Sequence, residues 1–316
     1  MGDRLLSQYR GTLLGAALGQ VLGANAQAQT QTDWQQIERW GFGLPVPHHP
    51  TPDLPHDSLH DPIAKLGQPM LSLGDGVIHQ PQQSIVLPSA ILGHPSTLAI
   101  ATLPITLYAH NHPKLLRSHL ERLSAPVSSL AVALAVGELI SQVMHTDQPP
   151  PALIEGAIAA QDLILIAPEL AATLQRVNVV ADQDSLAIAR HSLLAETPAD
   201  YVPLCLALYC FLSTPEHPAI VLLRAAQISP LPLTCALAGA LCGARNGISS
   251  LPATWRVQAQ QSGSITALWG VSESALDSLA AMLFAAWAGI YMPSLRDGKL
   301  PHPAWVVAPA GKLRPR

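Results

Sequence analysis

Seven histidines and aspartates crowd a proline-rich stretch from residue 41 to residue 62, where they could bind a metal ion or catalyse a hydrolysis. They are His48, His49, Asp53, His56, Asp57, His60 and Asp61. Imidazole and carboxylate groups are common metal ligands, and two carboxylates about 5 to 10 Å apart can hydrolyse a glycosidic bond without a metal. The prolines disfavour a preset coordination geometry, so we expect a polar loop that binds no metal. An alternative catalytic site comprises Asp53, His56, Asp57, His60 and Asp61.

A second stretch, residues 227–234, leads into a helix of small apolar residues, where an active-site loop is often found. It reads QISPLPLT and contains no acid. Other catalytic classes lack their motifs, because the chain has no P-loop, no dinucleotide-binding glycine fingerprint after a strand and no nucleophile elbow. The cysteines have neither zinc-site nor disulfide spacing and are predicted to be small buried residues in a reducing compartment. They are Cys205, Cys210, Cys235 and Cys242.

The composition favours a partner protein over nucleic acid. About half of the residues are apolar, 12% are charged and the net charge is −4, so there is no basic footprint for nucleic acid. A surface so poor in charge is typical of an interface with another protein. No secretory signal begins the chain, and we expect a cytoplasmic protein without a membrane-spanning stretch. The apolar residues 275–292 are predicted to form a buried core helix, with peripheral membrane contact as the alternative.

The spacing of apolar residues predicts an all-α fold, a compact multi-helix orthogonal bundle. Glycines at 11, 15, 19 and 23 recur on one face of a first helix over residues 4–24, so another backbone must pack closely there. We expect a single domain over residues 1–292, with a loop-rich insertion over 41–92 and an irregular tail over 293–316. Further helices are predicted over 96–110, 113–123, 127–145, 150–160, 167–176, 182–195, 199–213, 216–226, 233–246, 252–262 and 273–291. Residues 63–92 are predicted to be irregular, with a turn at 74–76 and a short strand at 84–87.

Three stretches resemble the ADP-ribosylglycohydrolase family, the dinitrogenase-reductase-activating glycohydrolase type. Residues 9–23 resemble the family's opening helix, RGxLxGxAxGDAxG, and residues 206–227 resemble the helix pair that leads to its late metal motif. Residues 236–244, with Ile248, Pro252 and Trp255, resemble the pattern AIAGAxxGAxxGxxxIPxxW. The resemblance spans roughly residues 5–260.

This resemblance implies two magnesium ions, held by an early Thr-Asp-Asp-Thr and a late Asp-Thr-Asp-Thr motif. Two adjacent dications need several carboxylates, and the metals would orient the ADP-ribose hydroxyls and a water. The late motif falls on Pro230, Leu231, Pro232 and Leu233, and the early motif falls on His94, Pro95, Ser96 and Thr97. The acid of the opening helix is Gln20 here, and no Asp or Glu occurs from 77 to 120 or from 217 to 272. We therefore expect the family's scaffold without its magnesium ions and without any other cofactor.

Three functions remain open on the sequence alone. The leading hypothesis is a non-catalytic family member, a protein-binding, assembly or regulatory subunit. The second is an active hydrolase of ADP-ribosyl or related N-glycosidic bonds that uses the residues of the His/Asp loop. The third is a membrane-peripheral helical assembly factor that makes contact through residues 275–292.

Overall fold

A computed structural model describes residues 2–28, 65–79, 86–145, 150–181, 186–228 and 232–290. Within these ranges the chain is helical and contains no strand, which confirms the all-α prediction. The buried apolar side chains of the described helices form one continuous core. The predicted tail, residues 293–316, lies outside the described residues, as does the greater part of the predicted insertion.

The described helices range from 4 residues in α4 to 27 in α1, and most connections between them are only a few residues long. In chain order they are α1 Gly2–Ala28, α3 Gly67–His79, α4 Ser89–Leu92, α5 Pro95–Ala101, α6 Leu103–Ala109, α7 Pro113–Glu121, α8 Val127–His145, α9 Pro150–Ala160, α10 Leu163–Ile166, α11 Pro168–Ala181, α12 Leu186–Glu196, α13 Val202–Ser213, α14 Pro218–Ile228, α15 Pro232–Asn246, α16 Ala253–Ser262, α17 Ser264–Trp269 and α18 Glu273–Trp287. Short 3-10 turns at Ala199–Tyr201 and Ile248–Ser250 precede α13 and α16.

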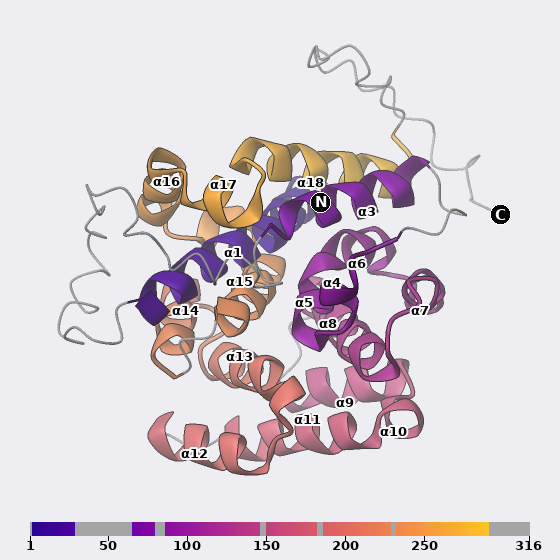
Figure 1. The fold of residues 1–316 in the computed structure, drawn as a ribbon, viewed down its shortest axis with the longest axis vertical. Helices are drawn as coiled ribbons and strands as arrows, with labels where there is room; N and C mark the ends of the chain where they lie inside the picture. Colours follow the sequence, from indigo (N-terminus) through magenta and orange to yellow (C-terminus); the bar gives the residue numbers. More distant parts are fainter. Residues whose placement is uncertain are drawn as a thin grey trace.

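Helices α1 and α15 form the centre of the molecule and run antiparallel (Figure 1). A Cβ atom added at Gly11, Gly15 or Gly19 would overlap backbone atoms of α15 or of the residues that follow it, and one added at Gly23 would come within 2.8 Å of the Pro232 Cα. The predicted close approach on the glycine stripe is therefore confirmed, and its partner is α15. Only residues without a side chain allow two helix backbones to come so near.

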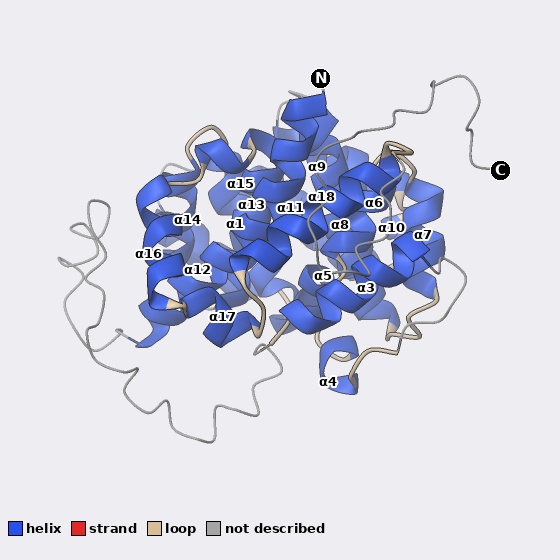
Figure 2. Cartoon of the chain, turned by 90° about the horizontal axis from the view of Figure 1, so that it is seen from above, coloured by secondary structure: helices blue, strands red, loops and turns tan. Residues whose placement is uncertain are grey.

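The other helices surround this pair. Helices α18 and α14 pack on α1, and α13 packs on α15, while α8 contacts both α5 and α15. Helices α9 to α12 lie together on one side of the molecule, and α16 to α18 lie on the opposite side (Figure 1). The view from above shows helices on every side of the central pair (Figure 2).

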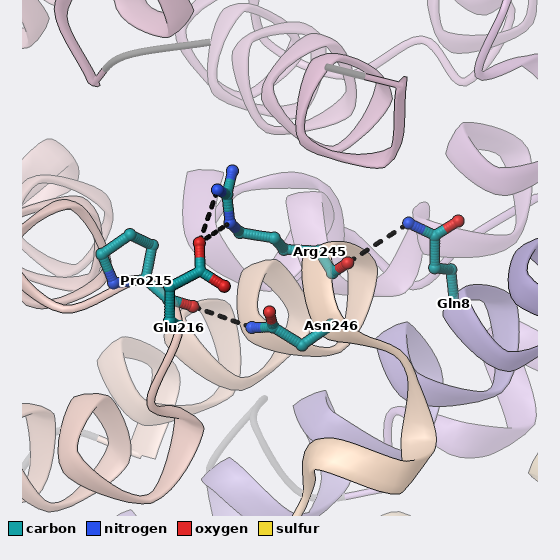
Figure 3. Close-up of polar contacts among 5 residues, drawn as sticks. All are labelled: Gln8, Pro215, Glu216, Arg245 and Asn246. Carbon is teal, nitrogen blue, oxygen red and sulfur yellow. Dashed lines mark hydrogen bonds and ion pairs between the residues drawn. The ribbon is translucent and has the colours of Figure 1, made fainter. Parts of the chain in front are cut away.

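The end of α15 is tied to its neighbours by a set of polar contacts (Figure 3). The Gln8 amide donates to the Arg245 carbonyl of α15 and to the Met144 carbonyl of α8, both at 3.3 Å. Arg245 donates to the Glu216 carboxylate at 2.6 and 3.0 Å, and the Asn246 amide donates to the Pro215 carbonyl at 2.8 Å. The two Gln8 bonds satisfy carbonyl groups that a helix C-terminus leaves without an intrahelical partner.

Helix α3 corrects the prediction that residues 63–92 are irregular. The Gly-Asp-Gly sequence at 74–76 is not a turn, because Met70, Leu73, Gly74 and Val77 form a buried face of α3 at helical spacing. Gly74 lies directly against the Leu279 side chain of α18, so a larger residue here would require that side chain to move. The close approach of another helix thus explains a glycine that resembled turn chemistry. Residues 86 and 87, the described part of the predicted strand, do not form a β-strand.

One predicted helix is divided in the structure, and two short helices were not predicted. The predicted helix over 96–110 is divided at Thr102 into α5 and α6, because Pro104 has no amide hydrogen to continue the ladder. The short helices α10 and α17 were not predicted, since four to six residues carry too little periodicity to be recognised.

Substitution of Gly15 by alanine should separate α1 from α15. The new Cβ would overlap the Gly239 carbonyl, which is backbone and cannot rotate away. We expect a loss of about 3 kcal/mol or more in the free energy of unfolding, measured by urea denaturation. Gly2→Ala is the matched control on the same helix, because its nearest neighbour, the Phe284 ring, is 3.8 Å away. Equal stability of the two variants would contradict the close-packed interface.

Candidate functional site

The first turn of α5 holds the four positions onto which the early magnesium motif falls. His94 is the extended residue before the helix and Pro95 begins it. Ser96 and Thr97 are 3% and 0% exposed, and neither hydroxyl has a hydrogen-bond partner in the described structure. The proline provides the fixed φ that a first helical turn prefers, so these two hydroxyls are buried in a rigid part of the backbone.

The first turn of α15 holds part of the late motif. Pro232 begins the helix and is buried, and Leu233 packs against the core. The next residue, Thr234, is 0% exposed, and its hydroxyl also has no partner in the described structure. Pro230 and Leu231 lie outside the described residues.

Three helices bring these positions into one region of the molecule. Helix α5 packs against α15. On α1, the backbone of Gly19 lies against Cys235 in the first turns of α15, and the next residue along, Gln20, is 1% exposed. Gln20 therefore lies beside the start of α15, as the resemblance to the opening motif implies. The region contains amide and hydroxyl groups rather than carboxylates.

These side chains do not fit a pair of magnesium ions. Magnesium requires hard oxygen ligands in near-octahedral geometry, and its protein sites depend on carboxylates. The first turn of α5 provides two hydroxyls after its proline, and the first turn of α15 provides one. All three hydroxyl groups are neutral. Within the described ranges, no group of three or more His, Cys, Asp and Glu side chains lies close enough together to hold a metal ion.

One contact in this part of the fold gave no sign in the sequence. Arg190 of α12 donates from Nε to the Ile228 carbonyl at 2.6 Å, at the end of α14. Arg190 and Ile228 are 38 residues apart, so local periodicity could not have predicted their contact.

The remaining predicted groups are placed as follows. The alternative site, Asp53, His56, Asp57, His60 and Asp61, lies outside the described residues. The four cysteines are buried and free, as predicted. Burial raises the pKa of the Cys205 and Cys210 thiols to about 12 and raises the pKa of Cys235 and Cys242 further. Since the thiolate is the reactive form, none of the four is a nucleophile at neutral pH.

The unpartnered hydroxyls generate a stability prediction. Valine has the shape of threonine without the hydroxyl, so Thr97→Val and Thr234→Val should leave the free energy of unfolding unchanged or raise it slightly. Thr12→Val is the matched control, because Thr12 is equally buried but its hydroxyl donates to the Gln8 carbonyl at 2.8 Å. We expect the control to lose about 1 kcal/mol in chemical denaturation. A loss of that size at Thr97 or Thr234 would show that their hydroxyls are paired in the fold.

Comparisons with known proteins agree with the fold and with the motifs. A family model described as ADP-ribosylglycohydrolase matches residues 86–290. A solved structure named "ADP-ribosylglycohydrolase-related protein complex" superposes with a TM-score of 0.54 at 16% sequence identity, covering 90% of this chain and 99% of that one. At that identity the similarity shows the fold alone. No curated protein matches the sequence.

Proposed function

The chain belongs to the ADP-ribosylglycohydrolase family, and we propose that it is a non-catalytic member that works by binding, as a protein-binding, assembly or regulatory subunit. The observation that carries this proposal is the donor set at the first turns of α5 and α15. Catalysis by the family's route depends on two magnesium ions, and the positions described here supply buried neutral hydroxyls in place of carboxylates. No reaction step through a metal is derived for this chain.

The scaffold around these positions is retained, which supports a binding role. The α1–α15 interface still needs glycine at Gly11, Gly15 and Gly19, although each costs about 1 kcal/mol relative to alanine within a helix. A chain that had lost every role would have no need to keep so demanding an interface.

A surface formed by α10, α11 and α12 supports a protein partner. Ile164 and Leu165 of α10 are 61% and 84% exposed, Val179 of α11 is 72% exposed and Ile188 of α12 is 60% exposed. Helix α11 packs against both α10 and α12, so these side chains lie on adjacent helices (Figure 1). Large apolar side chains exposed on neighbouring helices are consistent with contact to a partner protein. The solved structure with the same fold carries the name of a complex, which is in line with this role.

The apolar helices provide less support for membrane contact. In α18 the leucines face the core, and no large apolar side chain of its described residues is strongly exposed. The described helix that is long and apolar enough to cross a membrane is instead α8, and 78% of its apolar window is buried inside the protein. The buried leucines of α18 favour the predicted core helix over the alternative of peripheral membrane contact through 275–292. The burial of α8 is that of a core helix, and we favour a cytoplasmic location.

The proposal predicts an absence of metal-dependent hydrolysis. The purified full-length chain should release no ADP-ribose from ADP-ribosylated protein above a protein-free blank, with or without added magnesium or manganese. Its thermal midpoint should not rise with magnesium, since a ligand that binds only the folded state raises stability by mass action. A catalytically active member of the family serves as the positive control. Turnover, or a calorimetric heat of tight magnesium binding, would overturn the proposal.

The partner surface can be tested separately. Leu165→Glu and Ile188→Glu should each reduce capture of the partner at least tenfold, because a charge would replace an apolar contact. Gln175→Glu is the matched control, since Gln175 is an exposed polar residue of α11. Circular dichroism checks that the variants fold. Unchanged capture by both variants would remove the α10–α12 surface from the binding site.

A further inference from the structure

At the opposite end of α15 from the predicted motif, the ends of several helices meet around the imidazole of His110. His110 caps the C-terminus of α6 and is 1% exposed. Its ring stacks on His145 of α8, with centroids 4.8 Å apart and planes 15° from parallel. Trp287 of α18 lies 5.0 Å away, and Tyr9 of α1 meets the ring edge-on at 5.6 Å. Phe284 of α18 meets Tyr9 edge-on at 5.8 Å.

We call Tyr9, His110, His145, Phe284 and Trp287 the ring cluster. It joins residues from four helices that are far apart in sequence. A hydrogen bond connects it to the exposed residue Asn111, because the Trp287 indole N–H donates to the Asn111 side-chain oxygen at 3.2 Å. The serine hydroxyl of Ser141 in α8 donates to the His110 carbonyl. The ends of α8 and α18 are therefore held to α1 through the residues around His110.

The hydrogen bonds of His110 indicate which of its ring nitrogens carries the hydrogen. Nδ1 lies 2.8 Å from the Leu107 carbonyl, and a carbonyl can only accept, so Nδ1 carries the hydrogen. The Tyr9 hydroxyl donates to the same carbonyl at 2.7 Å. The other ring nitrogen, Nε2, is then a bare lone pair, and it is buried without a partner in the described structure. This arrangement suits the neutral imidazole.

Among the described residues, a proton on Nε2 would find no acceptor and no carboxylate that offsets its charge. The titratable groups that act on His110 are His145 of α8 and His112 in the following turn, and both oppose a second positive charge. Burial raises the pKa of the Tyr9 hydroxyl, so this group is neutral at these pH values. The charged pair that joins α1 to α18, Arg10 with Asp277 at 2.8 Å, is already matched, and Arg245 of α15 is paired with Glu216. Burial is the largest cause that lowers the pKa of His110, to about 4.

We propose that the ring cluster is an acid-sensitive latch: neutral His110 holds the ends of α8 and α18 against α1, and protonation of its Nε2 releases them. The latch is a property of the fold and does not depend on whether the chain is catalytic. In the released state His110 is in water and its pKa has the ordinary value of about 6.5. In the latched state its pKa is about 4. The released state therefore binds more protons at pH values between 4 and 6.5. Release therefore becomes more favourable as the pH falls from 6.5 towards 4.

The expected size of the effect follows from these two values. Between pH 7 and pH 5 the equilibrium constant for release should rise roughly 20-fold. Because the released elements are the ends of α8 and α18, we expect a local opening rather than unfolding of the whole chain. Helix α13 lies away from the ring cluster and should not respond.

Hydrogen exchange followed by mass spectrometry tests the latch on the full chain. After correction for the intrinsic pH dependence, exchange in peptides over 139–145 and 280–288 should be roughly 20-fold faster at pH 5 than at pH 7. Peptides over α13 should change little. If protection over 280–288 is the same at both pH values, the wild-type protein alone is enough to refute the latch.

Two substitutions identify the titrating group. His110→Gln keeps an amide that can donate to the Leu107 carbonyl but cannot titrate, so the pH dependence of exchange over 280–288 should disappear. His112→Gln is the control, because His112 is exposed and makes no ring contact of the cluster, and it should retain at least half of the effect. His145→Phe keeps the stacking partner and removes the second imidazole. An effect that persists in His110→Gln and vanishes in His145→Phe would assign the response to His145 and overturn the proposal.

Discussion

Direct backbone contact between α1 and α15 is the constraint on which the rest of the structure depends. The glycine stripe of α1 removes side chains from its side of the contact. Gly11 and Gly15 face glycines of α15, Gly243 and Gly239, whereas Gly19 and Gly23 lie against Cys235 and Pro232. The pair is almost entirely buried, so its neighbours must supply apolar surfaces on every side. Helices α8, α13, α14 and α18 do so, and the outer helices in turn cover these.

The same contact bears on our proposal that this chain has the family's scaffold without its metal ions. The glycine contacts determine where α15 starts relative to α1, and they do not depend on carboxylates in its first turn. Thr234, whose hydroxyl has no hydrogen-bond partner in the described structure, is held in place by the packing of Gly19 and Gly23 against the start of α15. A scaffold built in this way can form without the groups that bind dications.

The two ends of α15 differ in physical character. Its first turn contains one buried hydroxyl, that of Thr234, without a hydrogen-bond partner in the described structure. Its last turn is tied by Gln8, Glu216 and Pro215 and lies near a group of rings that includes a neutral imidazole. Buried polar groups without partners are costly, and both ends contain them. We interpret the first as a remnant of a lost site and the second as a place where the fold responds to protons.

The sequence alone determined the all-α class, the close approach on the glycine stripe, most of the longer helices and the family. Each of these depends on local periodicity or on residue types that only one packing arrangement tolerates. The absence of acids from 217 to 272 is likewise a property of the sequence and needs no structure to establish it.

Only the tertiary structure decided that α15 is the partner of the glycine stripe, that residues 74–76 lie within a helix, and that Arg190 and His110 have unusual surroundings. The two glycines at 74 and 76 by themselves predict a turn. In the structure Gly74 lies in a helix and contacts Leu279, which is about 200 residues away in the sequence. The ring neighbours of His110 likewise come from three other helices, α1, α8 and α18. The physical reason is the same in each case: burial and close packing join residues that are distant in the chain, and no local pattern records those contacts.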